Sequence, residues 1–245
     1  MIQAAKLASA KRITAVVPWF PYSRQDKKSA PREPISARLV AELLETAGID
    51  RLVTMDLHAG QMQGFFSKPV DHMTAMPILT QYVKDRLGTD NLVIIAPDAG
   101  RVKLVRKFAQ KLDVPYALLE KERPAHQVAK TGYVIGEVQD QTAVVVDDII
   151  DTGGTLSASA QTVMDEGAKE VYAVATHGVF SGNAFENLEK SPLSGIVVTD
   201  TIPIPEDRPE MIRVISTADL LTESIRKIFT DDSVSEIFAG ENQLF

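Results

Sequence analysis

The feature that most constrains the fold is the alternation of short apolar runs with longer amphipathic segments along the whole chain. The apolar runs predict strands at Ile13–Pro18, Arg51–Asp56, Leu92–Ala96, Tyr116–Glu120, Thr142–Asp147, Val171–Thr176 and Gly195–Thr199. The amphipathic segments predict helices at Ser36–Ala47, Met76–Leu87, Val102–Leu112, Leu156–Glu166 and Gly182–Lys190. This alternation is typical of α/β proteins, in which helices cover parallel sheets and ligands bind at the carboxyl ends of the strands.

The composition narrows the class of protein further. A chain of 245 residues, 44% hydrophobic and 24% charged, is long enough for one large or two modest globular domains. The absence of cysteine excludes disulfides and thiolate metal sites, and it is compatible with a reducing cytoplasm. A net charge of −7 argues against nucleic acid as a partner, and no apolar run reaches the length of a membrane span. Small anionic substrates therefore need local basic clusters or metal ions.

The densest cluster of polar side chains follows the apolar residues Val144–Val146. Two adjacent carboxylates, Asp147 and Asp148, come directly after this run, and a turn leads from there into the next predicted helix. The turn consists of Asp151, Thr152, Gly153, Gly154 and Thr155. A glycine turn at a helix start leaves backbone N–H groups unpaired, and a phosphate can accept their hydrogen bonds.

The carboxylates of Asp147 and Asp148 would repel that phosphate, so they must serve another part of a ligand. They are suited to accept the hydroxyl groups of a sugar, or to hold a cation that does so. A phosphate at the turn and a sugar diol at the acids predict a site for a sugar phosphate such as ribose 5-phosphate. The alternative is an ordinary strand–turn–helix connection, for which two carboxylates on the buried side of a strand would be costly.

The loop after the first predicted strand places Arg24 and Gln25 among aromatic and basic residues. Such a mixture suits the stacking of a base and the neutralisation of a triphosphate. Composition alone favours the alternative, a solvated basic loop whose aromatic side chains pack on the core.

Two further strand ends carry candidate metal ligands. Asp56 and His58 are two residues apart at a strand tip and are therefore expected on one face. A lone histidine is more often a packed or capping residue, and Mg²⁺ prefers oxygen ligands. Asp98 begins another strand–helix junction, and its carboxylate suits a metal ion. Arg101 and Lys103 follow it and fit the anion that the metal carries. A helix start with basic residues on the surface is an equal alternative.

The cations Lys121 and Arg123 flank an acid at the end of a predicted strand. The polar residues that follow, with Gly132 and Gly136, fit a mobile lid or a hairpin. Cations on a lid would suit the stabilisation of transition-state charge in phosphoryl transfer, and a surface salt-bridge cluster is the alternative.

Five motifs in this order resemble those of the ribose-phosphate pyrophosphokinase family, which shares its fold with the type I phosphoribosyltransferases. The motifs are Arg24–Lys28, Asp56–Ala59, Pro97–Gly100, Lys121–Pro124 and Asp147–Thr155. The resemblance implies transfer of the diphosphoryl group of MgATP to the anomeric hydroxyl of ribose 5-phosphate, with Mg²⁺ as cofactor. It also implies homo-oligomers, since the family builds hexamers from dimers.

The resemblance further implies a role for each matching residue. Arg24 and Gln25 would contact ATP, and His58 and Asp98 would hold its Mg²⁺. Lys121 and Arg123 would stabilise the transition state. The carboxylates of Asp147 and Asp148 would bind the ribose hydroxyls, directly or through a second Mg²⁺. The segment Asp151–Thr155 would hold the 5-phosphate. Arg101 departs from the family pattern, because many relatives have a second glycine there.

The domain organisation implied by the resemblance is a pair of phosphoribosyltransferase-like domains, the first of them incomplete. We expect residues 1–67 to be a remnant of the first domain and residues 68–231 to form the second, with residues 232–245 returning to the first. Met1–Ala10 predicts the back half of an amphipathic helix, and an upstream segment is expected to be missing. Two alternative functions are a weakly active or inactive regulatory homologue that binds ribose phosphates or nucleotides, and a phosphoribosyltransferase.

Overall fold

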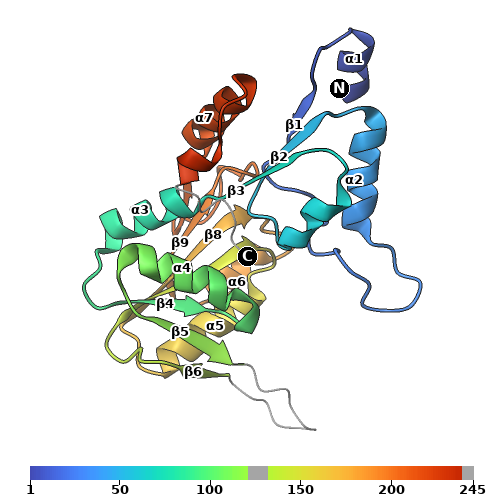
Figure 1. The fold of residues 1–245 in the computed structure, drawn as a ribbon. Helices are drawn as coiled ribbons and strands as arrows, with labels where there is room; N and C mark the ends of the chain where they lie inside the picture. The colour runs from blue at the N-terminus through green and yellow to red at the C-terminus, as the bar shows by residue number, and fades with distance from the viewer. Residues whose placement is uncertain (121–131, 239–245) are drawn as a thin grey trace. The chain divides into compact units, whose positions relative to one another are not determined.

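The computed structural model describes residues 1–120 and 132–238 and divides the chain into two compact units (Figure 1). Unit 1 comprises residues 1–75 together with the segment from Ala218 onward, and unit 2 is the continuous segment Met76–Thr217. The expected boundary after residue 67 falls one strand earlier than the division of the structure. The reason is that β3 (Val70–Met73) pairs with β2 (Arg51–Met55) and extends the sheet of unit 1.

Unit 1 is built on a parallel sheet in the order β1-β2-β3, with β1 at Thr14–Val16. Its helices are α1 (Ile2–Leu7), α2 (Ser36–Ala47) and the short 3₁₀ segment η1 (Gly60–Phe65). Helix α2 ends at Gly48, whose left-handed conformation (φ 108°) closes the last turn of the helix. Apolar residues of the sheet, α2 and η1 form its core, among them Phe20, Ala37, Leu52 and Met62.

The C-terminal part of unit 1 consists of α7 (Ala218–Phe229) and η3 (Ser235–Phe238). An ion pair of 2.8 Å between Arg12 Nη1 and Asp231 Oδ1 joins it to the N-terminal part. Helix α7 therefore belongs to unit 1, whereas the expected return to the first domain began only at residue 232.

Unit 2 contains a sheet in the order β10-β9-β8-β7-β4-β5-β6. All neighbouring pairs are parallel except the edge pair of β5 and β6, which is antiparallel. The strands are β4 (Leu92–Ala96), β5 (Tyr116–Glu120), β6 (Tyr133–Ile135), β7 (Thr142–Ile150), β8 (Glu170–Gly178), β9 (Leu193–Thr199) and β10 (Ile212–Ile215). The expected α/β class with parallel sheets is confirmed.

The helices of unit 2 pack in two pairs on the sheet (Figure 1). Helix α3 (Met76–Leu87) contacts α4 (Val102–Leu112), and α5 (Gly154–Asp165) contacts α6 (Ala184–Glu189). Alternate sheet residues such as Val93, Ile95 and Val145 join α5 in one fully buried core. Burial on both faces explains why the central strands are nearly continuous apolar runs.

The strand order of unit 2 reverses between β4 and β7. From β4 the chain passes through η2 (Ala99–Arg101) and α4 to β5 on one side, whereas from β7 it passes through α5 to β8 on the other. Ligands of open α/β sheets bind at such a reversal, outside the carboxyl ends of the two strands. The residues that follow β4 and β7 are therefore expected to form the ligand site.

Two strands and one helix of the described residues were not predicted, namely β3, β10 and α7, and β6 was expected only as one arm of a possible hairpin. The strands are short, and β3 and β10 lie at sheet edges. Each includes charged or polar residues, which interrupt the apolar run by which a strand is recognised. In the described ranges, no helix combines the length and the hydropathy that a bilayer span requires.

Candidate functional site

The two adjacent acids lie near the carboxyl end of β7, at the point where the strand order reverses. β7 continues to Ile150, three residues past its predicted end, because β8 keeps pairing with it as far as Gly178. The side chain of Asp148 is 5% exposed and that of Asp147 is 28% exposed. Both carboxylates therefore lie within the sheet rather than on a solvated strand tip.

Arg101 contacts both of these carboxylates. Its Nε lies 2.9 Å from Oδ1 of Asp147, and its Nη2 lies 2.7 Å from Oδ1 of Asp148. Arg101 is itself buried, at the end of η2 directly before α4. The expectation that Arg101 fits a bound anion is wrong, because its guanidinium is held by two carboxylates from the neighbouring strand.

Burial raises the pKa of Asp147 to about 8, and the adjacent carboxylate of Asp148 adds to the rise. The guanidinium of Arg101 and the backbone N–H of Asp148, which donates to Oδ1 of Asp147 over 2.8 Å, act in the opposite direction. Perturbed carboxylates at a strand end are a common mark of functional sites.

The turn after β7 depends on the conformation of Gly153, which has φ +77°. A Cβ atom there would lie 2.9 Å from Cγ of Leu188, which is fully buried on α6. Glycine therefore meets two requirements at this position, the left-handed backbone and the close approach of α6.

Hydrogen bonds from residues for which the sequence analysis predicted no role hold the same turn. The amide Nδ2 of Asn187 donates to the carbonyl of Thr152 over 2.9 Å, and Oγ of Ser181 donates to the carboxylate of Asp151. Ser157 Oγ donates to the carbonyls of Gly153 and Asn187 over 2.9 Å and 3.2 Å. Ser181 and Asn187 lie at least thirty residues along the chain from the turn that they contact. These contacts follow from the packing of α6 against α5 and could not be read from the local sequence.

The turn presents exposed donors at the start of α5. Thr152, Gly154 and Thr155 are exposed, and Gly154 is the first residue of the helix. The first N–H groups of a helix have no partner within it, and the helix dipole favours a negative charge there. The expected phosphate-binding residues are thus brought together in one turn.

Asp98 caps the junction after β4. Its Oδ1 accepts a hydrogen bond of 2.8 Å from the N–H of Gly100, and the residue is exposed. Exposed carboxylate oxygen is the ligand type that Mg²⁺ prefers, so the residue fits its expected metal role. In the part of the chain that the structure describes, no group of three His, Asp and Glu side chains is arranged to hold a metal.

Arg24 and Gln25 lie in unit 1, in the exposed loop that leads from β1 to α2. The backbone of Gln25 closes a turn with Tyr22, and its carbonyl accepts from the N–H of Ala37 in α2. Phe20 is not available to stack a base, because it is buried against Phe66 in the core of unit 1, with ring centroids 5.8 Å apart. The loop therefore exposes Arg24, Gln25 and the neighbouring Tyr22, while Phe20 packs inward as the alternative predicted.

Asp56 and His58 follow β2 in unit 1. Asp56 is buried with φ +38°, and its Oδ2 accepts from the N–H of Ala75 over 2.9 Å, whereas His58 is half-buried. The left-handed conformation of Asp56 ends the strand, so the strand alternation behind the expectation that both side chains share one face does not extend to His58. The N–H of Leu57 donates to Nε2 of the buried His72 over 2.8 Å, which fixes the backbone that carries His58.

Lys121 and Arg123, the expected transition-state cations, lie outside the described residues. The structure places only the end of β5 before them and β6 after the gap, and the antiparallel pairing of β5 with β6 agrees with the hairpin that was one of two expectations.

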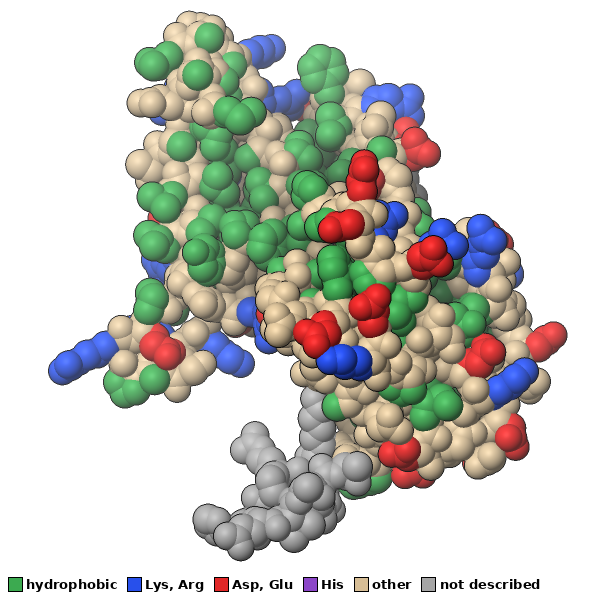
Figure 2. Space-filling view, turned by 180° about the vertical axis from the view of Figure 1, so that it is seen from behind, with side chains coloured by type: hydrophobic (Ala, Val, Ile, Leu, Met, Phe, Trp, Pro, Cys, Tyr) green, Lys and Arg blue, Asp and Glu red, His purple; other side chains and the backbone are tan. Residues whose placement is uncertain are grey.

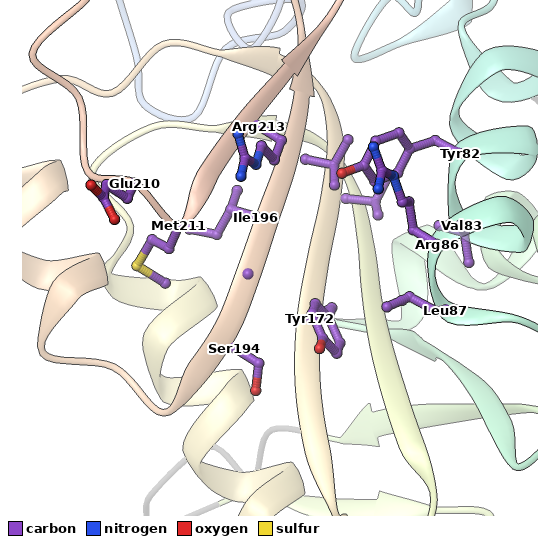
Figure 3. Close-up of a pocket in the computed structure, with 13 residues that line it drawn as sticks. Tyr82, Val83, Arg86, Leu87, Tyr172, Ser194, Ile196, Glu210, Met211 and Arg213 are labelled. Carbon is purple, nitrogen blue, oxygen red and sulfur yellow. The ribbon is translucent and has the colours of Figure 1, made fainter.

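A separate cavity of about 260 Å³ lies between α3 and the strands β8, β9 and β10 (Figure 3). Tyr82 and Arg86 of α3 line one side, with the guanidinium carbon 6.0 Å from the centroid of the tyrosine ring. Tyr172, Met211 and Arg213 line the other side. No residue expected to bind substrate lines this cavity.

Comparison with known proteins decides the family. A family model described as the phosphoribosyl synthetase-associated domain matches residues 107–239, and one described as the N-terminal domain of ribose phosphate pyrophosphokinase matches residues 1–48. A ribose-phosphate pyrophosphokinase from Clostridium acetobutylicum is 49% identical over 243 residues, which are 98% of this chain and 76% of that protein. The chain belongs to the ribose-phosphate pyrophosphokinase family.

Other members of the ribose-phosphate pyrophosphokinase family agree with this assignment. The protein of that name from Caldanaerobacter subterraneus is 49% identical over 97% of this chain and 76% of its own length. The crystal structure of phosphoribosylpyrophosphate synthetase from Mycobacterium smegmatis aligns with a TM-score of 0.88 and 46% identity, covering 94% of this chain and 76% of that one. The resemblance inferred from the five motifs is thereby confirmed.

Proposed function

We propose that this chain transfers the diphosphoryl group of ATP to the anomeric hydroxyl of ribose 5-phosphate, giving phosphoribosyl pyrophosphate and AMP. The observation that carries the proposal is the junction after β7, where an exposed helix start follows a pair of acids in a chain of this family. The anomeric oxygen forms a bond to the β-phosphorus and releases its proton to solvent, and the bond from the β-phosphorus to the oxygen of AMP breaks.

The 5-phosphate is proposed to bind at the turn of Asp151, Thr152, Gly153, Gly154 and Thr155. Free N–H groups at the start of α5 and the hydroxyls of Thr152 and Thr155 supply donors for its oxygens. The hydrogen bonds from Asn187 and Ser181 hold the turn in place before the phosphate arrives. Such preorganisation reduces the entropy that binding must cost.

Asp147 and Asp148 are proposed to accept the ribose hydroxyls. Two hydroxyls held by fixed carboxylates, and a phosphate held at the turn, leave the sugar ring little freedom to rotate. The anomeric hydroxyl is then presented in one orientation, which is the main contribution that a protein makes to phosphoryl transfer.

Arg24 and Gln25 are proposed to contact ATP, which their exposure in the loop after β1 permits. His58 and Asp98 are each proposed to contact the Mg²⁺ of ATP, and when bound the ion neutralises charge on the phosphates. Lys121 and Arg123 are proposed to stabilise the charge of the transition state. No general base is needed in this scheme, because alignment and electrostatics supply most of the catalysis in such reactions.

A different argument counts against each of the two alternative functions. A phosphoribosyltransferase has no use for the motifs Arg24–Lys28 and Asp56–Ala59. A purely regulatory homologue has no need to keep His58, Lys121, Arg123 and both acids of β7. Homo-oligomers and a cytoplasmic location are further proposals. Hydrophobic side chains gather on one part of the surface in Figure 2, and the exposed apolar side chains of unit 1 include Leu39 and Leu43 on α2. Exposed apolar side chains of this kind would suit contact with a second copy.

The test is the release of AMP from MgATP, measured by a coupled assay with and without ribose 5-phosphate. We expect AMP only when both substrates are present, and phosphoribosyl pyrophosphate in equal amount. ATP binding without any AMP at high enzyme concentration would favour the regulatory alternative. Variants of Thr155 and Asp148 separate an active enzyme from a regulatory homologue. In an active enzyme, each variant should raise KM for ribose 5-phosphate.

A further inference from the structure

The side chain of Arg101 stands between two strands of unit 2 and contacts both acids of β7. It is 9% exposed, and its Nε and Nη2 atoms lie 2.9 Å and 2.7 Å from Oδ1 of Asp147 and Asp148. A guanidinium has fixed donor positions and stays charged, so it holds these carboxylates in one arrangement. The contact depends on strand order, because Arg101 follows β4, the neighbour of β7.

A divalent cation does not fit this pair of acids in the observed arrangement. Adjacent carboxylates attract Mg²⁺, which demands oxygen ligands at about 2.0–2.1 Å in near-octahedral geometry. The guanidinium already takes one oxygen of each carboxylate and places a positive charge where the ion would lie. A cation there would have to displace a buried arginine from both carboxylates, which is costly.

We propose that Arg101 is the resident cation of the Asp147–Asp148 pair, and that these acids accept the ribose hydroxyls directly, without a metal ion between them. Arg101 is thus a positioning residue that acts through the two carboxylates. The statement about ribose rests on the proposed function, because it assumes that the two acids contact the sugar.

The first experiment counts Mn²⁺ bound to the chain, using the EPR signal of the free ion, with no nucleotide or sugar present. Arg101→Ala is expected to bind one additional Mn²⁺, at least about tenfold tighter than any ion that the unaltered chain binds at this pair, because the positive charge that occupies the pair is removed and the ion can take its place. The double variant Arg101→Ala/Asp147→Asn should lose that ion. Lys103→Ala, which removes an equal charge from the exposed surface two residues away, should bind Mn²⁺ like the unaltered chain.

Two further variants guard against misfolding of Arg101→Ala. Arg101→Gln removes the charge but keeps a hydrogen-bonding side chain, and it should gain the same Mn²⁺. Arg101→Lys keeps the charge and should gain none. An unchanged Mn²⁺ count in folded Arg101→Gln or Arg101→Ala would overturn the proposal.

The second experiment measures the Kd of ribose 5-phosphate by calorimetry, in Mg²⁺ and in EDTA. The unaltered chain should bind equally in both to within about twofold, whereas Arg101→Ala should bind about tenfold more weakly in EDTA and recover in Mg²⁺. A tenfold loss for the unaltered chain in EDTA would overturn direct binding. If neither protein binds ribose 5-phosphate, the proposed function fails together with the statement about ribose, while the Mn²⁺ count still decides whether Arg101 excludes a cation.

Discussion

Two junctions of unit 2 have similar sequences but present different chemistry. After β4 the chain runs Asp98-Ala99-Gly100 into a helix, and after β7 it runs Asp151-Thr152-Gly153-Gly154 into another. The first junction turns a charged side chain, that of Arg101, onto the acids of the neighbouring strand. The second junction exposes bare backbone and hydroxyl groups, and side chains from α6 and the loop before it hold it in place.

The difference shows that a strand–turn–helix motif is defined by what packs around it. At the junction after β4 the decisive contacts are ionic and buried, so removal of one partner should cost more stability than a change at an exposed residue of the same junction. At the junction after β7 the decisive features are a left-handed glycine and a few hydrogen bonds, so changes there should mainly affect ligand binding. Substitutions at the two junctions test this division.

Replacement of Asp148 by Ala should lower the free energy of unfolding by roughly 3 kcal/mol, because it breaks a buried ion pair of Arg101. Urea unfolding followed by circular dichroism measures the change. The matched control is Asp98→Ala at the same edge of the sheet, where loss of an exposed cap should cost only about 1 kcal/mol. Equal losses for the two variants would contradict the division.

Replacement of Gly153 by Ala should lower the free energy of unfolding by about 1–3 kcal/mol and weaken ribose 5-phosphate binding by at least about tenfold. The causes are the positive φ and the approach of Leu188 Cγ to within 2.9 Å of the new Cβ. Gly154→Ala is the control for stability, since its Cβ would meet only Thr152 Oγ1 at 4.0 Å. Thermal unfolding and calorimetry should separate the two glycines, and similar stability in both variants would mean that the turn relaxes freely.

The raised pKa of Asp147 predicts a pH-dependent effect of Asp147→Asn. The folded chain keeps a proton on this carboxyl that the unfolded chain releases, so its contribution to stability falls as pH rises from about 4 to about 8. The variant lacks this loss and should gain stability relative to the unaltered chain as pH rises from 5 to 8, measured by urea unfolding.

Asp200 supplies the control for this pH effect. Burial raises its pKa, but hydrogen bonds from Ser216 and Thr217 outweigh burial and hold the pKa below its usual range. Its contribution is therefore lost only as pH falls through the acidic range, and the effect of Asp200→Asn should be constant between about pH 5 and pH 8. A constant effect for Asp147→Asn as well would show that the acids of β7 do not interact as described.

Replacement of Asn187 by Ala should have the smallest effect, about 0.5–1 kcal/mol, because it removes one exposed hydrogen bond to the carbonyl of Thr152. Binding of ribose 5-phosphate should weaken by a few fold, since the turn is then held less firmly before the ligand arrives. Calorimetry checks the affinity. Loss of affinity without loss of stability would assign Asn187 wholly to preorganisation of the turn.

Much of the fold could be predicted from local patterns. The helices α2, α3 and α4 and the strands β4 and β5 begin and end where the sequence predicted, because each has a clear apolar period and a turn at its end. Helix α7 was missed although its pattern is amphipathic, and it leaves Ile225 and Phe229 exposed. The acids and the glycine turn of β7 were recognisable because they are contiguous.

The rest of the site could not be predicted from local patterns. The ion pairs of Arg101 depend on β4 lying beside β7, and no period in the sequence encodes strand order. The hydrogen bond from Asn187 to the carbonyl of Thr152 depends on the packing of α6 against α5. The inward position of Phe20 depends on its contact with Phe66. Each of these is a contact between segments far apart along the chain.

The discontinuity of unit 1 has a consequence for the order of folding during synthesis. Its sheet forms from the first part of the chain, but α7 and Asp231, the partner of Arg12, are made only after all of unit 2. At a translation rate of about 5–20 residues per second, the N-terminal part waits several seconds or more for the segment that completes it. Unit 2 is continuous and can mature first, so the nascent chain acquires its proposed sugar-phosphate turn before the half that is proposed to contact ATP is finished.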